Sequence, residues 1–168
     1  MKTILLLRHG KSDWEADYDD DHERPLAERG RGAAAQMGTL LARVNQVPER
    51  VLCSSAVRAS ETVRLAVEAG SWPCSVEVVP EFYGTSTDAV LARVATEDDA
   101  VSSVLLAGHE PAWSVLAADL IGGGELRFPT AAMARIDFDV DRWSLVQPAT
   151  GSLVWFVIPR LLKAAGLC

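Results

Sequence analysis

Short apolar runs alternate along the chain with segments whose apolar residues recur every three or four positions. Such runs are typical of strands that are covered on both faces of a sheet. The first four predict strands at Thr3–Leu7, Arg50–Cys53, Ser75–Val79 and Ser103–Ala107. Two later runs, Ala134–Asp139 and Ser152–Ile158, predict strands that pair antiparallel at one edge of the sheet.

Helical periodicity fills the intervals between the first strands. The first helical stripe consists of Ala33, Met37, Leu40, Leu41 and Val44. The last consists of Trp113, Leu116, Ala117, Leu120 and Ile121. Valines between residues 57 and 67 and between 90 and 94 mark two weaker helices. This alternation predicts an α/β protein, a three-layer α/β/α sandwich around a mostly parallel central sheet. With no repeat or linker, we expect one domain over residues 1–168.

The composition is that of a globular protein, and its charge narrows the possible partners. Of 168 residues, 49% are hydrophobic and 23% charged, which suffices for a real core. The 16 basic and 23 acidic residues leave a net charge of −7, which disfavours binding to nucleic acid or anionic membranes. No apolar stretch approaches the roughly 20 residues that a membrane span needs. We therefore expect a cytoplasmic protein with neither nucleic acid nor membrane as partner.

The three cysteines fit reduced thiols better than a disulfide framework. Cys53, Cys74 and Cys168 are widely spaced and include no C-x-x-C pair, so no zinc site is predicted either. Cys53 lies in an apolar run and is expected in the core. Cys168, the last residue, is expected to be exposed.

The first strand ends in two polar side chains, Arg8 and His9, followed by Gly10. Placing an arginine and a histidine at the end of a buried strand costs free energy unless these side chains have a function there. A histidine there can attack a phosphate as a nucleophile, and a neighbouring guanidinium can bind the oxygens of that phosphate. The pair alone is common enough by chance that it does not establish function.

Two further segments place polar residues at the same edge of the predicted sheet. CSSAVRAS follows the second strand and puts Arg58 in the first turn of a helix, while LLAGHEP follows the fourth and puts His109 just before another helix. Alone, Arg58 could be a solvated helix residue and His109 a helix cap. Together with Arg8, His9 and two helix N-termini, which favour anions, they predict a phosphate pocket beyond the strand ends.

At this point the chain resembles a known family. LLLRHGKS, SSAVRASET and AGHEP match the pattern of the histidine phosphatase superfamily, which has the phosphoglycerate mutase-like fold. The short length, RPLAERG at 24–30 and PEFYG at 80–84 resemble SixA-type phosphohistidine phosphatases. The resemblance extends to about Gly122. It implies that His9 is the nucleophile and that Arg8, Arg58 and His109 bind the phosphate.

The resemblance also implies a mechanism without metal or cofactor. Neutral His9 attacks phosphorus, becomes phosphohistidine and is released by water, while Arg8, Arg58 and a protonated His109 hold the phosphoryl oxygens. In the superfamily a carboxylate after the third strand often protonates the leaving group, and Glu81 occupies that region. Glu81 could equally be a solvated loop residue. A phosphoramidate nitrogen is easier to expel than an alkoxide, so this substrate has less need of an acid.

The acidic run from Glu15 to Glu23 invites a metal interpretation. It lacks the glycine of an EF-hand loop, and a short acidic run does not by itself provide the defined geometry of a hard-metal site. We therefore predict no metal and a solvated acidic loop. Arg24, which follows the run, could reach the pocket or pair with this loop.

The sequence leaves three functions open. The first is a metal-independent phosphatase that removes phosphate from phosphohistidine on a protein, as the resemblance implies. The second is a phosphomonoesterase on the same fold, with a small phosphomonoester as substrate. The third, a noncatalytic phosphate-binding module, would not require a nucleophile such as His9.

Overall fold

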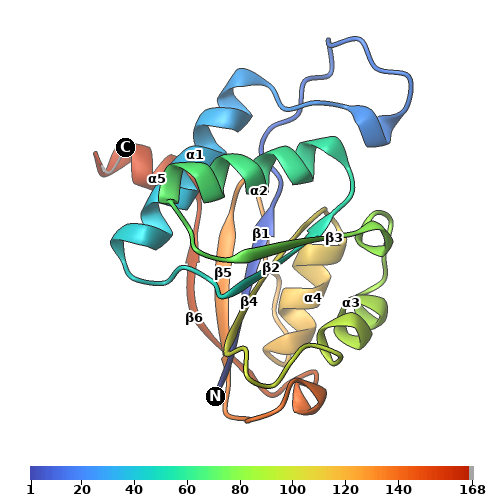
Figure 1. The fold of residues 1–168 in the computed structure, drawn as a ribbon, viewed down its shortest axis with the longest axis vertical. Helices are drawn as coiled ribbons and strands as arrows, with labels where there is room; N and C mark the ends of the chain where they lie inside the picture. The colour runs from blue at the N-terminus through green and yellow to red at the C-terminus, as the bar shows by residue number, and fades with distance from the viewer. Residues whose placement is uncertain (167–168) are drawn as a thin grey trace.

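Six strands form a single sheet in the computed structural model, which describes residues 1–166 (Figure 1). They are β1 (Lys2–Arg8), β2 (Arg50–Ser54), β3 (Ser75–Val79), β4 (Ser103–Gly108), β5 (Met133–Phe138) and β6 (Gly151–Val157). Their order is β3-β2-β4-β1-β5-β6. The first four are parallel, and β5 and β6 join antiparallel beside β1. The mostly parallel sheet and the antiparallel pair at one edge are both confirmed.

Helices cover both faces of this sheet (Figure 1). One face carries α1 (Glu28–Arg43), α2 (Val57–Gly70) and α5 (Pro159–Ala164), and the other carries α3 (Thr87–Val94) and α4 (Ala112–Leu120). Short 3-10 turns occur at η1 (Asp21–Glu23), η2 (Pro80–Phe82) and η3 (Trp143–Leu145).

Successive residues of β1 divide between the two cores, which explains why both faces are covered. Leu5 and Leu7 pack on the α1–α2 side, whereas Ile4 and Leu6 pack on the α3–α4 side. Because side chains alternate across a strand, a continuous apolar run needs a layer on each face. The predicted three-layer α/β/α sandwich is confirmed.

Two glycines of α1 bring this helix close to its neighbours. A Cβ on Gly38 would overlap the carbonyl oxygen of Ala66, so α1 and α2 touch backbone to backbone. A Cβ on Gly30 would overlap the carbonyl oxygen of Lys11. The first turn of α1 is therefore pressed against the segment that follows β1, where the candidate nucleophile lies.

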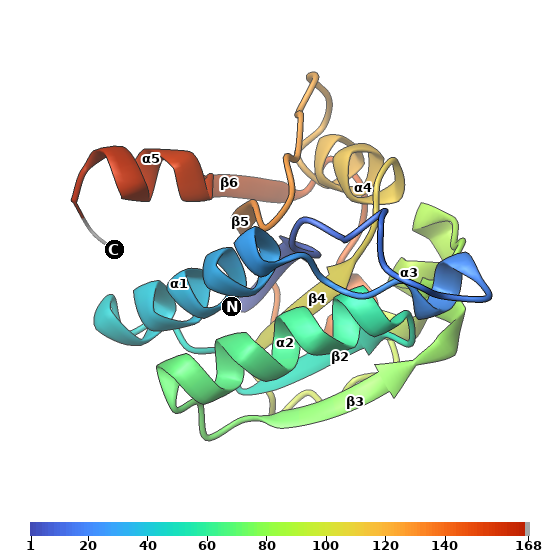
Figure 2. The ribbon, with the colours of Figure 1, turned by 90° about the horizontal axis from the view of Figure 1, so that it is seen from above.

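The connection from β1 to α1 is a long loop whose two ends run together. Ser12 bridges Leu26, and the amide of Asp13 donates to the carbonyl of Pro25 at 2.9 Å. The tip carries η1, which contacts α2 near its first turn (Figure 2). This loop thereby places the acidic run beside the strand ends.

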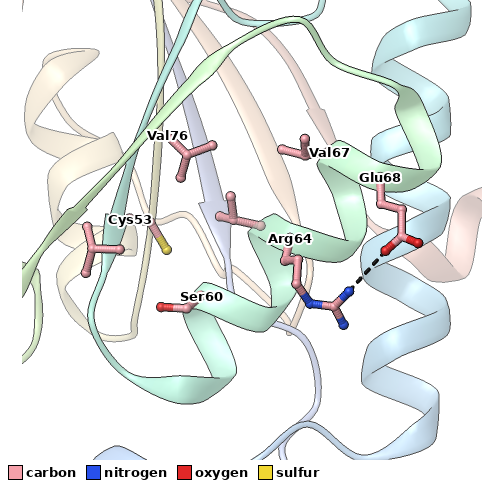
Figure 3. A pocket seen from close by; sticks show the side chains of 8 residues that line it. Cys53, Ser60, Arg64, Val67, Glu68 and Val76 are labelled. Carbon is pink, nitrogen blue, oxygen red and sulfur yellow. Dashed lines mark hydrogen bonds and ion pairs between the residues drawn. The ribbon is translucent and has the colours of Figure 1, made fainter.

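The structure also shows an apolar hollow whose lining includes none of Arg8, His9, Arg58 and His109 (Figure 3). It has a volume of about 370 Å³ between α2 and β3, where Val76 and Val78 are half exposed on the edge strand. Cys53 lines it, and burial raises the pKa of this thiol to about 12, as expected for a core residue rather than a nucleophile. Cys53 and Cys74 are free thiols, and Cys168 lies outside the described residues.

No helix in residues 1–166 is long and apolar enough to cross a membrane.

Candidate active site

The register of β1 and β4 sets the two histidines side by side. Arg8 pairs with Gly108 at the ends of these parallel strands, and the amide of His9 donates to the carbonyl of Gly108 at 3.0 Å. The next residue after β4 is His109, and its ring centroid lies 5.0 Å from that of His9. The predicted convergence of residues from separate strands is present at this edge.

His9 is held as a neutral ring with one free nitrogen. The side chain is buried, at 7% exposure, and Nδ1 donates to the carbonyl of Gly10 at 2.6 Å. Desolvation lowers the pKa of His9 to about 3, and the positive charges of His109, Arg58 and Arg8 add to the effect, against the opposing hydrogen bond to Gly10. With the proton on Nδ1, the lone pair on Nε2 is available for attack.

The two arginines present buried donors beside this ring. Arg8 Nη1 donates to the carbonyl of Phe128 at 2.6 Å, and Arg58 donates through Nη1 to the Asp21 carbonyl at 2.5 Å. The Nε groups of Arg8 and Arg58 are buried and have no acceptor within residues 1–166. Buried donors are normally paired, so these positions fit an anion that accepts from them.

A hydroxyl connects the Arg58 turn to the His9 loop. The Gly10 amide donates to Thr62 Oγ1 at 2.9 Å, and the same hydroxyl donates to the Arg58 carbonyl at 2.6 Å. Thr62 is fully buried in α2. This bridge holds the first turn of α2 at a constant position relative to the candidate nucleophile.

His109 has one hydrogen-bonded ring nitrogen and one buried nitrogen without a partner within residues 1–166. Its Nε2 bonds with Ser54 Oγ at 2.8 Å, while its buried Nδ1 has no partner among the residues that the structure describes. Desolvation lowers the pKa of His109 to about 4, and the charge of Arg58 adds to this. Burial beside arginines therefore disfavours a positive charge on this ring, and the protonated His109 that the resemblance implies during phosphate transfer stays a prediction.

Asp21 joins the site, although the sequence predicts only a solvated acidic loop. Its carboxylate accepts from Arg24 Nε and Arg58 Nη2, each at 3.0 Å, and from the Tyr83 hydroxyl at 3.1 Å. Burial acts to raise the pKa of Asp21, but Arg24 and Arg58 outweigh it and the net pKa is lowered. Asp21 is therefore an ionised positioning group for Arg58. No sequence signal separates it from the neighbouring aspartates.

Arg24 pairs with the acidic loop, one of its two expected roles. It forms an ion pair with Asp21 at 2.8 Å, donates to Ser12 Oγ and stacks its guanidinium 3.5 Å from the ring centroid of Trp14. Among the described residues, no group of three His, Cys, Asp or Glu side chains could hold a metal ion.

Glu81, the proposed acid, and Glu110, which follows His109, are placed differently. Glu81 is exposed on η2 and forms no hydrogen bond or ion pair with any residue in 1–166, whereas Tyr83, two residues later, packs its ring edge-on to His109 at 5.7 Å. Glu110 accepts from the Ser114 hydroxyl at 2.7 Å in the first turn of α4. The role of Glu81 as an acid stays a prediction.

Fold and site together define an α/β enzyme with a candidate histidine nucleophile and an anion pocket at the strand ends. The profile of the histidine phosphatase superfamily (branch 1) matches residues 4–83. A Mycobacterium tuberculosis protein of uncharacterized function is 34% identical over 166 residues, which cover 92% of this chain and 100% of that protein. The chain belongs to the histidine phosphatase superfamily and is a phosphatase of the SixA type.

Two named relatives support the assignment to the SixA type. The phosphohistidine phosphatase SixA of Escherichia coli K12 is 29% identical over 165 residues, covering 96% of this chain and 97% of the relative. A solved structure of the protein histidine phosphatase SixA complexed with tungstate superposes with a TM-score of 0.83 at 29% identity, covering 96% and 99% of the two chains. The fold is the phosphoglycerate mutase-like fold of these relatives.

Proposed function

We propose that this phosphatase works without a metal through a phosphohistidine on His9, and that its substrate is phosphohistidine on a protein. The observation that carries the proposal is the state of His9. Nδ1 donates to Gly10, Nε2 keeps its lone pair, and the charges of Arg58 and Arg8 act on the ring. A neutral nucleophile next to buried guanidinium groups suits attack on a phosphoryl anion.

The reaction has two displacements at phosphorus. In the first, the Nε2 lone pair of His9 forms a bond to phosphorus, and the bond from phosphorus to the leaving atom breaks with its electron pair. Because Nδ1 keeps its proton through the bond to Gly10, the phosphorylated ring is cationic and is itself a good leaving group. In the second, water attacks phosphorus and loses a proton, the electron pair returns to Nε2, and inorganic phosphate leaves.

The phosphoryl group would supply hydrogen-bond acceptors for the arginine donors that have none. Its oxygens can accept from the unpaired Nε groups of Arg8 and Arg58. The negative charge also opposes the effect of Arg58 on His109 and so raises the pKa of that ring toward a donating state. Asp21 keeps Arg58 oriented during both displacements.

The relatives and the leaving group both support a phosphohistidine substrate. SixA of Escherichia coli is named a phosphohistidine phosphatase, and tungstate is a tetrahedral oxyanion like phosphate. A departing imidazole is expelled more readily than an alkoxide. The ionised state of Asp21 and the exposed position of Glu81 are compatible with such a leaving group, which has little need of an acid.

A pulse-labelling experiment tests the nucleophile. Brief exposure to a histidine protein carrying radioactive phosphate on its imidazole, followed by alkaline quenching, should leave acid-labile label on His9. His9→Ala should take up none, and His22→Gln, which removes the third histidine, should retain the label. Acid-stable label, or label that persists in His9→Ala, would overturn the mechanism. A panel that includes small phosphomonoesters then ranks the substrate classes.

Glu81→Gln tests the remaining acid assignment. If Glu81 protonates oxygen leaving groups, this change should slow alkyl or aryl phosphates by about 10²-fold or more and phosphohistidine far less. Equal small effects on both substrates would remove Glu81 from the mechanism.

A further inference from the structure

Four basic side chains near the site form no ion pair within the described part of the chain. Most arginines of this acidic protein are paired with carboxylates, as in the bridges of Arg31 to Glu61 and Arg93 to Glu97. The unpaired basic residues of interest are exposed: Lys11, Arg29, Arg160 and Lys163. In a chain of net charge −7, a gathering of unpaired cations points to an acidic partner.

These four side chains line one groove between α1 and α5, here called the basic groove. Two adjoining hollows of about 430 and 290 Å³ make up the groove and share Arg29, Ala33, Pro159 and Arg160. None of the residues that line either hollow is an aspartate or a glutamate. The groove follows α1 from Arg29 to Gln36, about 10 Å of helix, which is longer than a single phosphate.

One end of the basic groove reaches the active site. The hollow that contains Lys11 is also lined by Pro129 and Thr130. These residues lie between Phe128, whose carbonyl accepts from Arg8, and Ala131, whose amide donates to the carbonyl of His9. A chain lying in the groove would therefore lead directly to the nucleophile.

The opposite flank of the site is acidic. Both ribbon views place α5 and η1 on opposite sides of the end of β1 (Figures 1 and 2). The acidic loop bears η1, while Leu162 anchors α5 in the core beneath the basic groove. This arrangement is unfavourable to a long polyanion such as nucleic acid, which would meet the acidic flank, and favours a partner whose charge is local.

We propose that the basic groove binds an acidic segment next to the phosphohistidine of a substrate protein. The inference rests on the proposed function and adds the chemistry of the partner. The cations attract the segment during encounter and hold it along α1, while the phosphorylated imidazole enters between Arg8 and Arg58.

Paired phosphopeptides test the proposal. Two histidine peptides of equal length, phosphorylated on the imidazole with phosphoramidate, carry either glutamates or glutamines around the histidine. We expect the native enzyme to hydrolyse the glutamate peptide with a kcat/KM about tenfold higher at low salt, the advantage shrinking as salt is added. Arg29→Glu and Lys163→Glu should each abolish the advantage through KM and leave aryl phosphate turnover unchanged.

Arg43→Glu is the matched control. Arg43 is exposed and unpaired within residues 1–166, lies in the last turn of the same helix as Arg29, and undergoes the same change of charge. Its variant should keep the glutamate preference, and thermal melting checks that each variant is folded. Glu at position 29 is compatible with the positive N-terminal end of α1, so Arg29→Glu is expected to fold.

The outcomes separate the two proposals. Equal hydrolysis of both peptides by the native enzyme, or a preference that survives Arg29→Glu and Lys163→Glu, overturns the docking surface and leaves the phosphohistidine activity standing. Hydrolysis of aryl phosphate but of neither peptide overturns both. Binding of duplex DNA or anionic vesicles that Arg29→Glu abolishes, without any peptide preference, assigns the groove to a different partner and also overturns the inference.

Discussion

The neutral state of His9 predicts a measurable dependence of stability on pH. The pKa of His9 is about 3 in the folded protein and close to the ordinary 6.5 in the unfolded chain. Between these values the unfolded state binds more protons, so the free energy of unfolding falls as the pH drops below 6.5 and levels off below about 3. Each pH unit in this window removes about 1.4 kcal/mol, which makes the loss from His9 about 3 kcal/mol at pH 4.

Urea unfolding of the native protein and of His9→Gln isolates this contribution. Between pH 7 and pH 4 the native protein should lose about 3 kcal/mol more than the variant, because His109 and the carboxylates titrate in both. Nuclear magnetic resonance of the imidazole nitrogens should show His9 protonated on Nδ1 and uncharged at pH 5. A His9 ring that titrates near 6.5, or equal losses in the two proteins, would refute the burial argument and with it the basis for a neutral nucleophile.

Two further predictions concern Asp21 and two glycines of α1. Asp21→Asn should lower kcat about tenfold without raising KM, because Arg58 loses its orienting carboxylate while the pocket becomes more positive; an increased KM with normal kcat would contradict this role. Gly38→Ala should destabilise the fold by about 2 kcal/mol or more, because its methyl group meets the Ala66 backbone. Gly32→Ala in the same helix, with nothing within 4 Å, should instead stabilise by about 0.5–1 kcal/mol. Similar melting temperatures for these two glycine variants would disprove the close packing of α1 on α2.

Much of the fold follows from local pattern. Buried runs such as that of β1 are hydrophobic on both faces, and this requires helices on each side of the sheet. The polar residues at strand ends then gather at one edge because parallel strands share a direction, and for this reason the sequence alone associates Arg8, His9 and His109. The resemblance to a known family supplies the proposed nucleophile and the proposed substrate class.

Long-range packing decided the features of the site and of its surroundings that local pattern does not predict. Asp21 is one of three consecutive aspartates, and only the path of the loop across α2 brings its carboxylate to Arg58. The lowered pKa of His109 depends on burial beside Arg58, which no local pattern reveals. The basic groove joins residues more than a hundred positions apart, Arg29 and Arg160, because α5 returns to pack on α1. Sequence by itself determined the layers and the gathering of polar side chains at the strand ends, since both depend on periodicity and strand direction. Tertiary structure decided the charge states and the surface beside the candidate nucleophile, since both depend on which distant groups meet and how much water they exclude.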